Sequence, residues 1–541
     1  MLDLTGPRGA VATSDPLAAQ AGAEILRRGG NAIDAAVATM LTECVANPAN
    51  VGIAGYGGCA VVFLARERRV VSIDFDSVAP FASAPDMFEI DPEADDWQIE
   101  SGTARVVGRR NEHGYLAVST PGVVAGLAHM LRRCGTMSWA EASEPAIRYA
   151  ENGFPLSAGN AASVKDLAEN ADEVSRRAFL PDGDIPSEGE PFVQRDLAET
   201  LRTLAHEGPD AFYGSDIAGR IVKQIAEHGG VLQMADFASY SPVESDPIAL
   251  ECGGYELHTP PLPSGGVTSL QIVRAMHEAD PPLPPLGKGG QWGGQADYYH
   301  LLIEISKLAW LDRIHECGDP AFIDDPTWRL LGSAHTIDLI ASAGLAEPSG
   351  APVGAPGPAG CTVHTVAADA GGNFVSLTAT QGGRFGSRVV IDGLGLIVGH
   401  GMSRFDPVPG RPNSIAPGKR VLHNMSPMIL TRGGEIAGAF GLPGGRKIVN
   451  VAAQMALSFV EFGLTPSQAV NAPRIHTEGR EPVTVTGLSP EVIESLTSRG
   501  HRIESIQGRI GGPACAIMLD RETGCLLAAS ERGPGCVAVV V

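Results

Sequence analysis

The sequence of 541 residues lacks several features that would place it in common protein classes. It contains no run of about 18 apolar residues, the minimum for a membrane-spanning helix, and its first twenty residues lack the apolar core of a secretory signal peptide. Basic residues are scarce, because 40 Lys and Arg stand against 62 Asp and Glu and leave a net charge of −22. We therefore expect a cytoplasmic protein whose partners include neither nucleic acid nor an anionic membrane.

Metal and phosphate motifs are also missing. The nine cysteines are dispersed, none in a Cys-x-x-Cys pair or at metal-ligand spacing, which predicts reduced thiols and no metal site. The glycine-rich tract GYGG (55–58) lacks the lysine and the strand–loop–helix order of a phosphate-binding loop. Neither feature predicts a cofactor.

Glycine and proline, in contrast, are abundant, with 67 and 40 residues, and the hydrophobic content is 44%. This composition is typical of a globular, layered protein of α and β elements with many turns. The length allows two or three domains. Near the N-terminus, Asp15 followed by Pro16, and then Asn31, have the chemistry of helix caps, so two helices are predicted to begin there.

The most informative stretch is GCTVHTVAADAGGNFVSLTATQGGRFG (360–386). The run before it, residues 345–360, consists almost entirely of small residues, Pro and Gly, which predicts a flexible arm. Thr362–Val366 and Phe374–Thr378 read as two strands by β-branched content, joined by a turn at Asp369–Asn373. A mobile arm is therefore expected to lead into a buried hairpin, with the junction between residues 361 and 362.

This junction suits an N-terminal nucleophile. If the Cys361–Thr362 bond is cut, Thr362 gains a free α-amine, which titrates near neutrality, beside a hydroxyl that needs a base to act as a nucleophile. A surface linker followed by an ordinary hairpin explains the stretch alone equally well. If cleavage fell one residue earlier, Cys361 would be the new terminus and the nucleophile. His364 is a candidate base, although a packed strand histidine fits its position better.

The motifs GCTVHT…GGNFVSLTAT…RFGS resemble the start of the small chain of γ-glutamyltranspeptidases, and GGNAIDAAVA (29–38) resembles the opening of their large chain. The resemblance covers nearly the whole chain. It implies an α+β fold, the four-layer αββα sandwich of N-terminal nucleophile hydrolases. It also implies cleavage into chains 1–361, ending in the Pro/Gly arm (345–361), and 362–541, which stay associated as one unit.

The resemblance also assigns the site. It places the nucleophile on Thr362 and a hydrogen-bonding partner on Thr380. A strand ending at Gly441 leads into a Pro-Gly-Gly turn before a helix, and backbone N–H groups at such a turn can hold an oxyanion. The family's oxyanion glycines fall on Gly444 and Gly445. Two glycines that merely permit the turn are the alternative.

The sequence departs from the family where the glutamyl group would bind. The family's substrate-binding arginine falls on Pro85, a carboxylate becomes Arg404, a Ser-Ser pair becomes His423-Asn424, and an Asn becomes Gly382. A cation in place of an anion reverses the preference of the site, so γ-glutamyl compounds are expected to be poor substrates. Arg404, with Arg384 or His423, would favour a substrate carboxylate. Alternatively, Arg404 pairs with Asp406 and does not meet the substrate.

The expected activity is that of an autoprocessed threonine amidohydrolase or acyltransferase acting on a small, carboxylate-bearing, non-glutamyl acyl substrate without a cofactor. The alternatives are a hydrolase of C–C bonds or oxalyl groups in a biosynthetic pathway, a true γ-glutamyl hydrolase or transpeptidase, and a non-catalytic relative that kept the fold.

Overall fold

The computed structural model of the chain describes residues 3–170, 173–179, 186–214, 216–279, 296–345, 361–533 and 537–541. Residues 346–360, the body of the expected Pro/Gly arm, lie outside the described residues.

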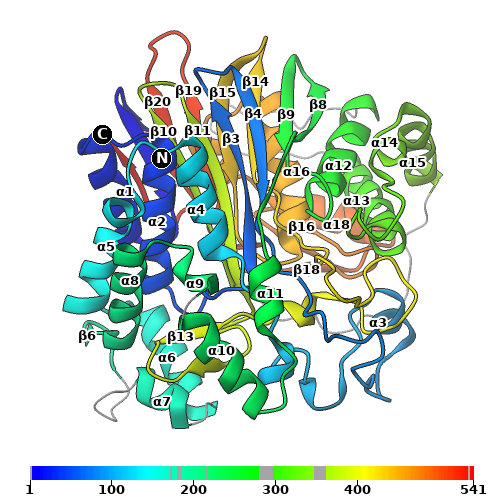
Figure 1. Cartoon of the computed structure of the whole chain (residues 1–541). Helices are drawn as coiled ribbons and strands as arrows, with labels where there is room; N and C mark the ends of the chain where they lie inside the picture. Colours follow the sequence, from blue (N-terminus) through cyan, green and yellow to red (C-terminus); the bar gives the residue numbers. More distant parts are fainter. Residues whose placement is uncertain are drawn as a thin grey trace.

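Two antiparallel sheets of seven strands each form the centre of the molecule and face one another (Figure 1). In spatial order, the first sheet contains β1 (Leu4–Gly6), β20 (Leu526–Ser530), β19 (Cys515–Leu519), β15 (Glu435–Gly441), β14 (Met428–Arg432), β9 (Tyr255–Thr259) and β8 (Ile248–Cys252). The second contains β21 (Val537–Val540), β2 (Gly9–Thr13), β10 (Cys361–Asp369), β11 (Phe374–Gly382), β3 (Gly57–Leu64), β4 (Arg69–Asp74) and β7 (Val243–Ser245).

Helices cover the outer face of each sheet, which completes the expected αββα sandwich (Figure 1). The second sheet is covered mainly by α1 (Pro16–Arg27), α2 (Ala32–Ala46), α4 (Val123–Cys134), α5 (Trp139–Asn152) and α8 (Arg195–Glu207). The first sheet is covered by α12 (Gly266–Ala279), α13 (Ala296–Glu316), α15 (Ser333–Leu345), α16 (Lys447–Val460) and α17 (Pro466–Val470).

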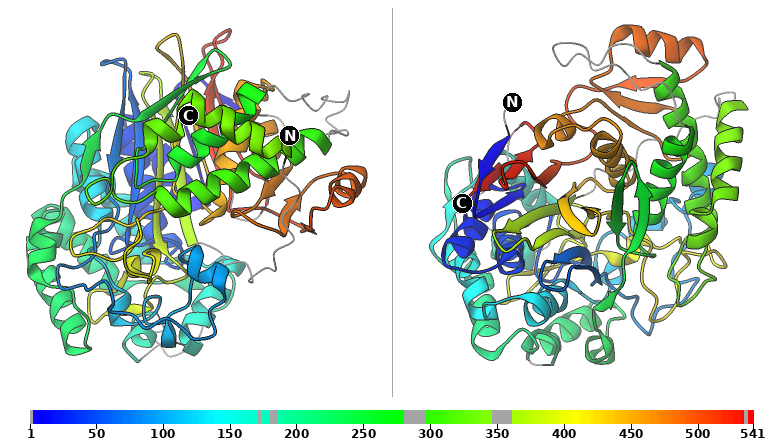
Figure 2. Two further views of the ribbon diagram at one scale, coloured as in Figure 1. Left: turned by 90° about the vertical axis from the view of Figure 1, so that its right-hand side faces the viewer. Right: turned by 90° about the horizontal axis from the view of Figure 1, so that it is seen from above.

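Smaller elements surround the sandwich. The helices are α3 (Asp96–Glu100), α6 (Ala158–Asn170), α7 (Glu173–Phe179), α9 (Ala211–Gly214), α10 (Asp216–Glu227), α11 (Met234–Ser239) and α14 (Thr327–Leu330). The strand pairs are β5 (Phe154–Pro155) with β6 (Pro191–Phe192) and β12 (Val389–Ile391) with β13 (Leu396–Val398). A three-stranded sheet, β16 (Arg474–His476), β17 (Val483–Thr486) and β18 (Ile503–Ser505), stands out at one side with α18 (Pro490–Ser498) (Figure 2).

The predicted helix starts are confirmed. The Asp15 carboxylate accepts hydrogen bonds from the N–H groups of Leu17 and Ala18 at the start of α1. The Asn31 side chain caps α2 in the same way, because it accepts from the second and third N–H groups of that helix. These caps satisfy N–H groups that have no partner within a helix.

The predicted hairpin is also confirmed, and both of its strands are longer than expected. β10 and β11 pair so that Thr362 lies opposite Thr380, with a register shift between Cys361 and Thr362. The Asp369 carboxylate closes the turn by accepting from the N–H and side-chain amide of Asn373. Alternate residues of the central strands, among them Val61, Phe63, Val366 and Ala368, fill the space between the two sheets.

Candidate active site

A chain of hydrogen bonds surrounds the expected nucleophile. The Thr362 hydroxyl donates to Thr380 Oγ1 over 3.0 Å, and the Thr380 hydroxyl donates to the Cys361 carbonyl oxygen over 2.5 Å. The Gly382 N–H donates to Thr380 Oγ1 over 2.8 Å and fixes that side chain. Thr362 is 8% exposed and Thr380 is 1% exposed. The two hydroxyls therefore link the expected nucleophile to the carbonyl that it would attack.

His364, two residues further along β10, is a packed strand histidine. Its side chain is fully buried between the sheets, and its Nδ1 lies 2.8 Å from Thr378 Oγ1 rather than near Thr362. A Cβ on Gly441 at the end of β15 would come within 2.4 Å of the imidazole, so the ring fills the space beside that glycine. Burial lowers the pKa of His364 to about 3, which keeps the ring neutral.

The turn with Gly444 and Gly445 follows directly from Gly441 and leads into α16. Gly444 has φ of 144° and Gly445 has φ of 62°, values that strongly favour glycine. A Cβ on Gly444 would also come within 2.6 Å of the Gly511 Cα. Both glycines are thus required by the backbone path, and their role as oxyanion donors stays a prediction.

Arg404, at the end of the 3₁₀ turn Gly401–Arg404, is half-buried. The alternative pairing with Asp406 is not formed, because Asp406 pairs with Arg411 at 3.1 Å. Within the described parts of the chain, Arg404 makes no ion pair, and its buried Nε has no hydrogen-bond partner. Burial raises the pKa of the Cys361 thiol, and the positive charges of Arg384 and then Arg404 oppose that rise. Both guanidinium groups therefore lie near the junction.

His423 and Asn424 differ in how firmly they are held. The Asn424 side-chain oxygen accepts from Arg313 over 3.1 Å, and the same guanidinium donates to the His423 carbonyl over 2.7 Å. The His423 ring is buried, and neither of its nitrogens has a hydrogen-bond partner among the described residues. Burial and the charges of Arg313 and Arg420 lower its pKa to about 3, so the ring is neutral.

One residue of this region was missed from the sequence. Asp76, just beyond β4, is fully buried, and its Oδ2 lies 3.5 Å from His423 Nε2 without hydrogen-bond geometry. Burial, together with the carboxylate of Asp74, raises the pKa of Asp76 well above its ordinary value. The signal was present, since Asp74 and Asp76 lie two residues apart in the run VVSIDFD (70–76), which puts two carboxyls on one face of a predicted strand.

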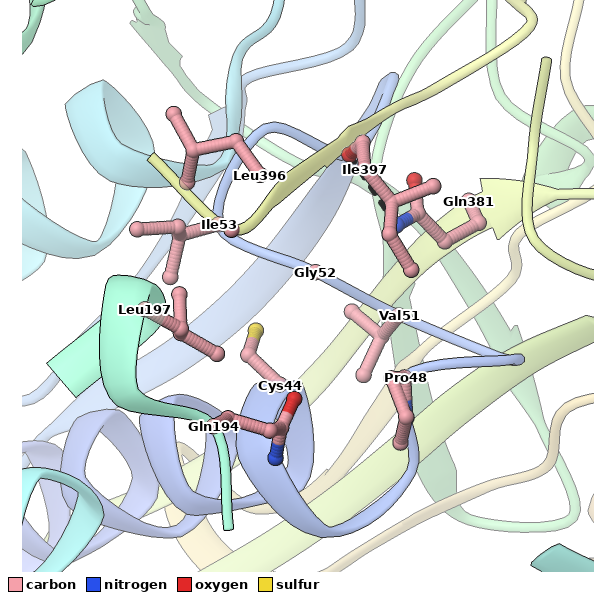
Figure 3. A pocket seen from close by; sticks show the side chains of 11 residues that line it. Cys44, Pro48, Val51, Gly52, Ile53, Gln194, Leu197, Gln381, Leu396 and Ile397 are labelled. Atoms are coloured by element: carbon pink, nitrogen blue, oxygen red, sulfur yellow. Dashed lines mark hydrogen bonds between the residues drawn. The ribbon is translucent and has the colours of Figure 1, made fainter. Parts of the chain in front are cut away.

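The cavity beside the neighbouring residue Gln381 is not a substrate site. It is lined by Cys44, Val51, Gln381 and Ile397, among others, and its volume is about 10 Å³, room for at most one water molecule (Figure 3). The Gln381 side chain points away from Thr380, as expected for consecutive strand residues, and donates to the Ile397 carbonyl.

Among the residues that the structure describes, two groups of side chains have metal-ligand chemistry, and both are on elements other than β10 and β11. In His300–Glu304–His501 the two imidazoles hydrogen-bond each other, and Lys307 pairs with Glu304. In Cys252–His277–Glu461 the carboxylate contacts both other side chains. These internal contacts satisfy the groups, and we assign no metal to either.

Known structures match the fold closely. The cephalosporin acylase from Bacillus halodurans superimposes with a TM-score of 0.87 at 27% identity, covering 100% of this chain and 97% of that one. A γ-glutamyltranspeptidase from Helicobacter pylori matches 61% of this chain and 90% of its own at 34% identity, with a TM-score of 0.54. The fold is that of the N-terminal nucleophile hydrolases and transferases.

Sequence comparisons lead to the family. The model of Gamma-glutamyltranspeptidase matches residues 18–540. An acylase proenzyme (Acylase ACY 1) of Pseudomonas sp. strain SE83 is 37% identical over 98% of this chain and 93% of its own length. The glutathione hydrolase proenzyme of Bacillus subtilis strain 168 is 31% identical over 99% of this chain and 92% of its own length. The chain belongs to the γ-glutamyltranspeptidase family, and its membership makes it an amidohydrolase or acylase of that family.

None of the described helices is long and apolar enough to cross a membrane.

Proposed function

We propose that the protein is a proenzyme that cleaves its own Cys361–Thr362 bond and then hydrolyses an amide of a small, carboxylate-bearing, non-glutamyl acyl group. The observation that carries this proposal is the hydrogen-bond chain from the Thr362 hydroxyl through Thr380 to the Cys361 carbonyl.

Maturation starts when Thr362 Oγ1 attacks the Cys361 carbonyl carbon. The C–N bond to Thr362 breaks, an ester to Oγ1 forms, and the hydroxyl proton passes to the leaving nitrogen, which becomes the free α-amine of Thr362. Water then hydrolyses the ester and leaves chains 1–361 and 362–541. Thr380, which donates to the carbonyl oxygen, stabilises the charge that develops there.

The two chains stay associated because both contribute strands to each of the two sheets and pair with one another there. In the second sheet, β10 and β11 lie between β2 and β3, so residues after 361 pair on both sides with residues before it. In the first sheet, β14, β15, β19 and β20 lie between β1 and β9. Separating the chains would break these ladders and expose the core between the sheets.

In turnover, the free α-amine of Thr362 takes the proton from its own hydroxyl, and Oγ1 attacks the substrate carbonyl. The N–H groups of Gly444 and Gly445 hold the oxyanion, the amine product leaves, and water or an acceptor amine takes the acyl group. Arg404, which lacks an ion pair in the described part of the chain, supports a preference for a substrate carboxylate.

The test is a time course of intact mass for wild-type protein, Thr362→Ala and a matched control, Thr365→Ala. Thr365 lies on the same strand, but its hydroxyl bonds Thr13 rather than Thr380. We expect cleavage in wild type and control and none in Thr362→Ala. A turnover assay of glutaryl, succinyl, oxamate and γ-glutamyl amides then ranks acyl groups. Cleavage in Thr362→Ala, or the mass of an uncut chain in fully active wild-type protein, would overturn the proposal.

A further inference from the structure

The carboxyl of Asp76 lies on the inner face of the second sheet. The Phe75 N–H donates to the Gly58 carbonyl over 2.9 Å, which carries the β3–β4 pairing past the end of β4 and sets Asp76 beside Gly57. A Cβ on Gly57 would come within 2.5 Å of the Asp76 Cα and 2.7 Å of its Oδ1. The carboxyl therefore occupies the space above Gly57.

Gly57 belongs to the same cross-strand row as the nucleophile. Thr380 on β11 pairs with Thr362 on one side and with Gly57 on the other. Residues paired across a sheet point to the same face, and neighbouring strands lie about 4.8 Å apart. The Asp76 carboxyl and the Thr362 hydroxyl thus face the same gap between the sheets, roughly two strand spacings, about 10 Å, apart.

Polar atoms without partners gather at this place. Asp76 Oδ2, both ring nitrogens of His423 and the Nε of Arg404 are buried and lack hydrogen bonds within the described parts of the chain. Asp76 is 0% exposed and His423 is 1% exposed. Buried polar groups are normally paired, so a set of unpaired ones around one point indicates a place for a ligand with its own polar atoms.

The charges at this place favour an anion. Arg404 is a cation without an ion pair in the described residues, and it lies close enough to influence both Asp76 and Cys361. Burial and then the neighbouring Asp74 raise the pKa of Asp76, while the charges of Arg420 and Arg404 oppose that rise. The net rise favours the protonated carboxyl, the form that can donate a hydrogen bond. A substrate ammonium would instead require an ionised Asp76 beside Asp74, which the like charge disfavours.

We propose that Asp76, together with His423, determines the acyl specificity of the site by binding the distal carboxylate of a short dicarboxylic acyl chain that Arg404 neutralises. This inference rests on the proposed function. An extended chain of four or five carbons spans about 4–5 Å between its carboxyl carbons. With about 3 Å for attack at one end and about 3 Å for a hydrogen bond at the other, it matches the separation of Thr362 and Gly57.

The experiment compares glutaryl p-nitroanilide with butyryl p-nitroanilide, which lacks the distal carboxylate, and with γ-glutamyl p-nitroanilide, which adds an ammonium. The variants are Asp76→Leu and the conservative Asp76→Asn, which keeps a neutral group that can donate. The readout is the ratio of kcat/KM for glutaryl over butyryl anilide. We expect at least a tenfold fall in this ratio for Asp76→Leu and a change below threefold for Asp76→Asn.

Three results would overturn the inference: an unchanged ratio in Asp76→Leu, an equal fall in both variants, or a wild type that prefers the γ-glutamyl anilide. The last would assign a substrate ammonium to an ionised Asp76, and an equal fall in both variants would mean that a neutral donor at position 76 is not what binds the distal carboxylate. Intact mass separates this inference from the proposed function, because cleavage at residue 362 with an unchanged ratio refutes only the role of Asp76. Absence of that cleavage in active wild type refutes the proposed function itself.

Discussion

The hydroxyl oxygens of Thr362 and Thr380 lie 3.0 Å apart across the β10–β11 pair, and the second of them donates to the carbonyl that precedes the first. Thr380 can therefore act in two ways, by orienting the Thr362 hydroxyl and by stabilising charge on the Cys361 oxygen. This relationship allows the two roles to be tested by changing a residue that is not the nucleophile.

Removing the Thr380 hydroxyl is expected to slow self-cleavage. In Thr380→Val the side chain keeps its shape but cannot donate to the Cys361 carbonyl, so cleavage should slow about 100-fold, the cost of one lost donor at a developing oxyanion. Thr380→Ser should keep most of the rate. The measurement is the half-time of cleavage on a denaturing gel. Equal half-times for wild type and Thr380→Val would exclude this role.

The position of the cut can be tested at Cys361. The Cys361→Ala variant should still cleave, with Thr362 as the first residue of the small chain, because the thiol takes no part in the attack. Burial raises the pKa of this thiol, which disfavours the nucleophilic thiolate. N-terminal sequencing and intact mass of the small chain provide the measurement. A small chain that begins at residue 361 in wild type would point to the cysteine instead.

Reversing the charge of Arg404 is expected to reverse substrate preference. Arg404→Asp should lower kcat/KM for glutaryl anilide by about 10–100-fold, as expected for loss of a hydrogen bond to a charged group. It should also raise γ-glutamyl anilide turnover relative to glutaryl, because a carboxylate there can face the substrate ammonium. Arg404→Lys keeps the positive charge but loses the planar guanidinium, so its kcat/KM for glutaryl anilide should lie between those of wild type and Arg404→Asp. If all three proteins show the same ratio, Arg404 does not meet the substrate.

Acid should destabilise the protein through its buried histidines. Burial lowers the pKa of His364, His400 and His423 to about 3. Between pH 6.5 and 3 the unfolded chain binds a proton at each histidine while the folded chain does not. Each one therefore lowers the free energy of unfolding by about 1.4 kcal/mol per pH unit as the pH falls.

The variant His423→Gln removes one of these three contributions. Its loss of thermal stability between pH 7 and pH 4.5 should be smaller than that of wild type, even if the variant is less stable at pH 7. Melting temperatures across this range provide the measurement. Parallel curves for the two proteins would mean that His423 is already protonated or exposed in the folded state.

Patterns within a few residues of one another predicted the hairpin and the helix starts. The β-branched runs after residue 361 predicted the hairpin, since such residues pack well on a pleated surface, and the turn chemistry of Asp369–Asn373 marked its end. The caps at Asp15 and Asn31 were predictable for a similar reason, because a helix start is satisfied by a side chain next to it in sequence. The facing sheets were predicted through the family resemblance rather than from periodicity.

By itself, the sequence determined the elements and the chemistry available at the junction, because these depend on residues within a few positions of one another. Only the tertiary structure decided which distant side chains meet. In the folded chain Asp406 pairs with Arg411, and Arg404 makes no ion pair within the described residues. Asp76 lies beside His423. Such contacts depend on how strands from opposite ends of the chain align across two sheets, and no local pattern encodes that alignment.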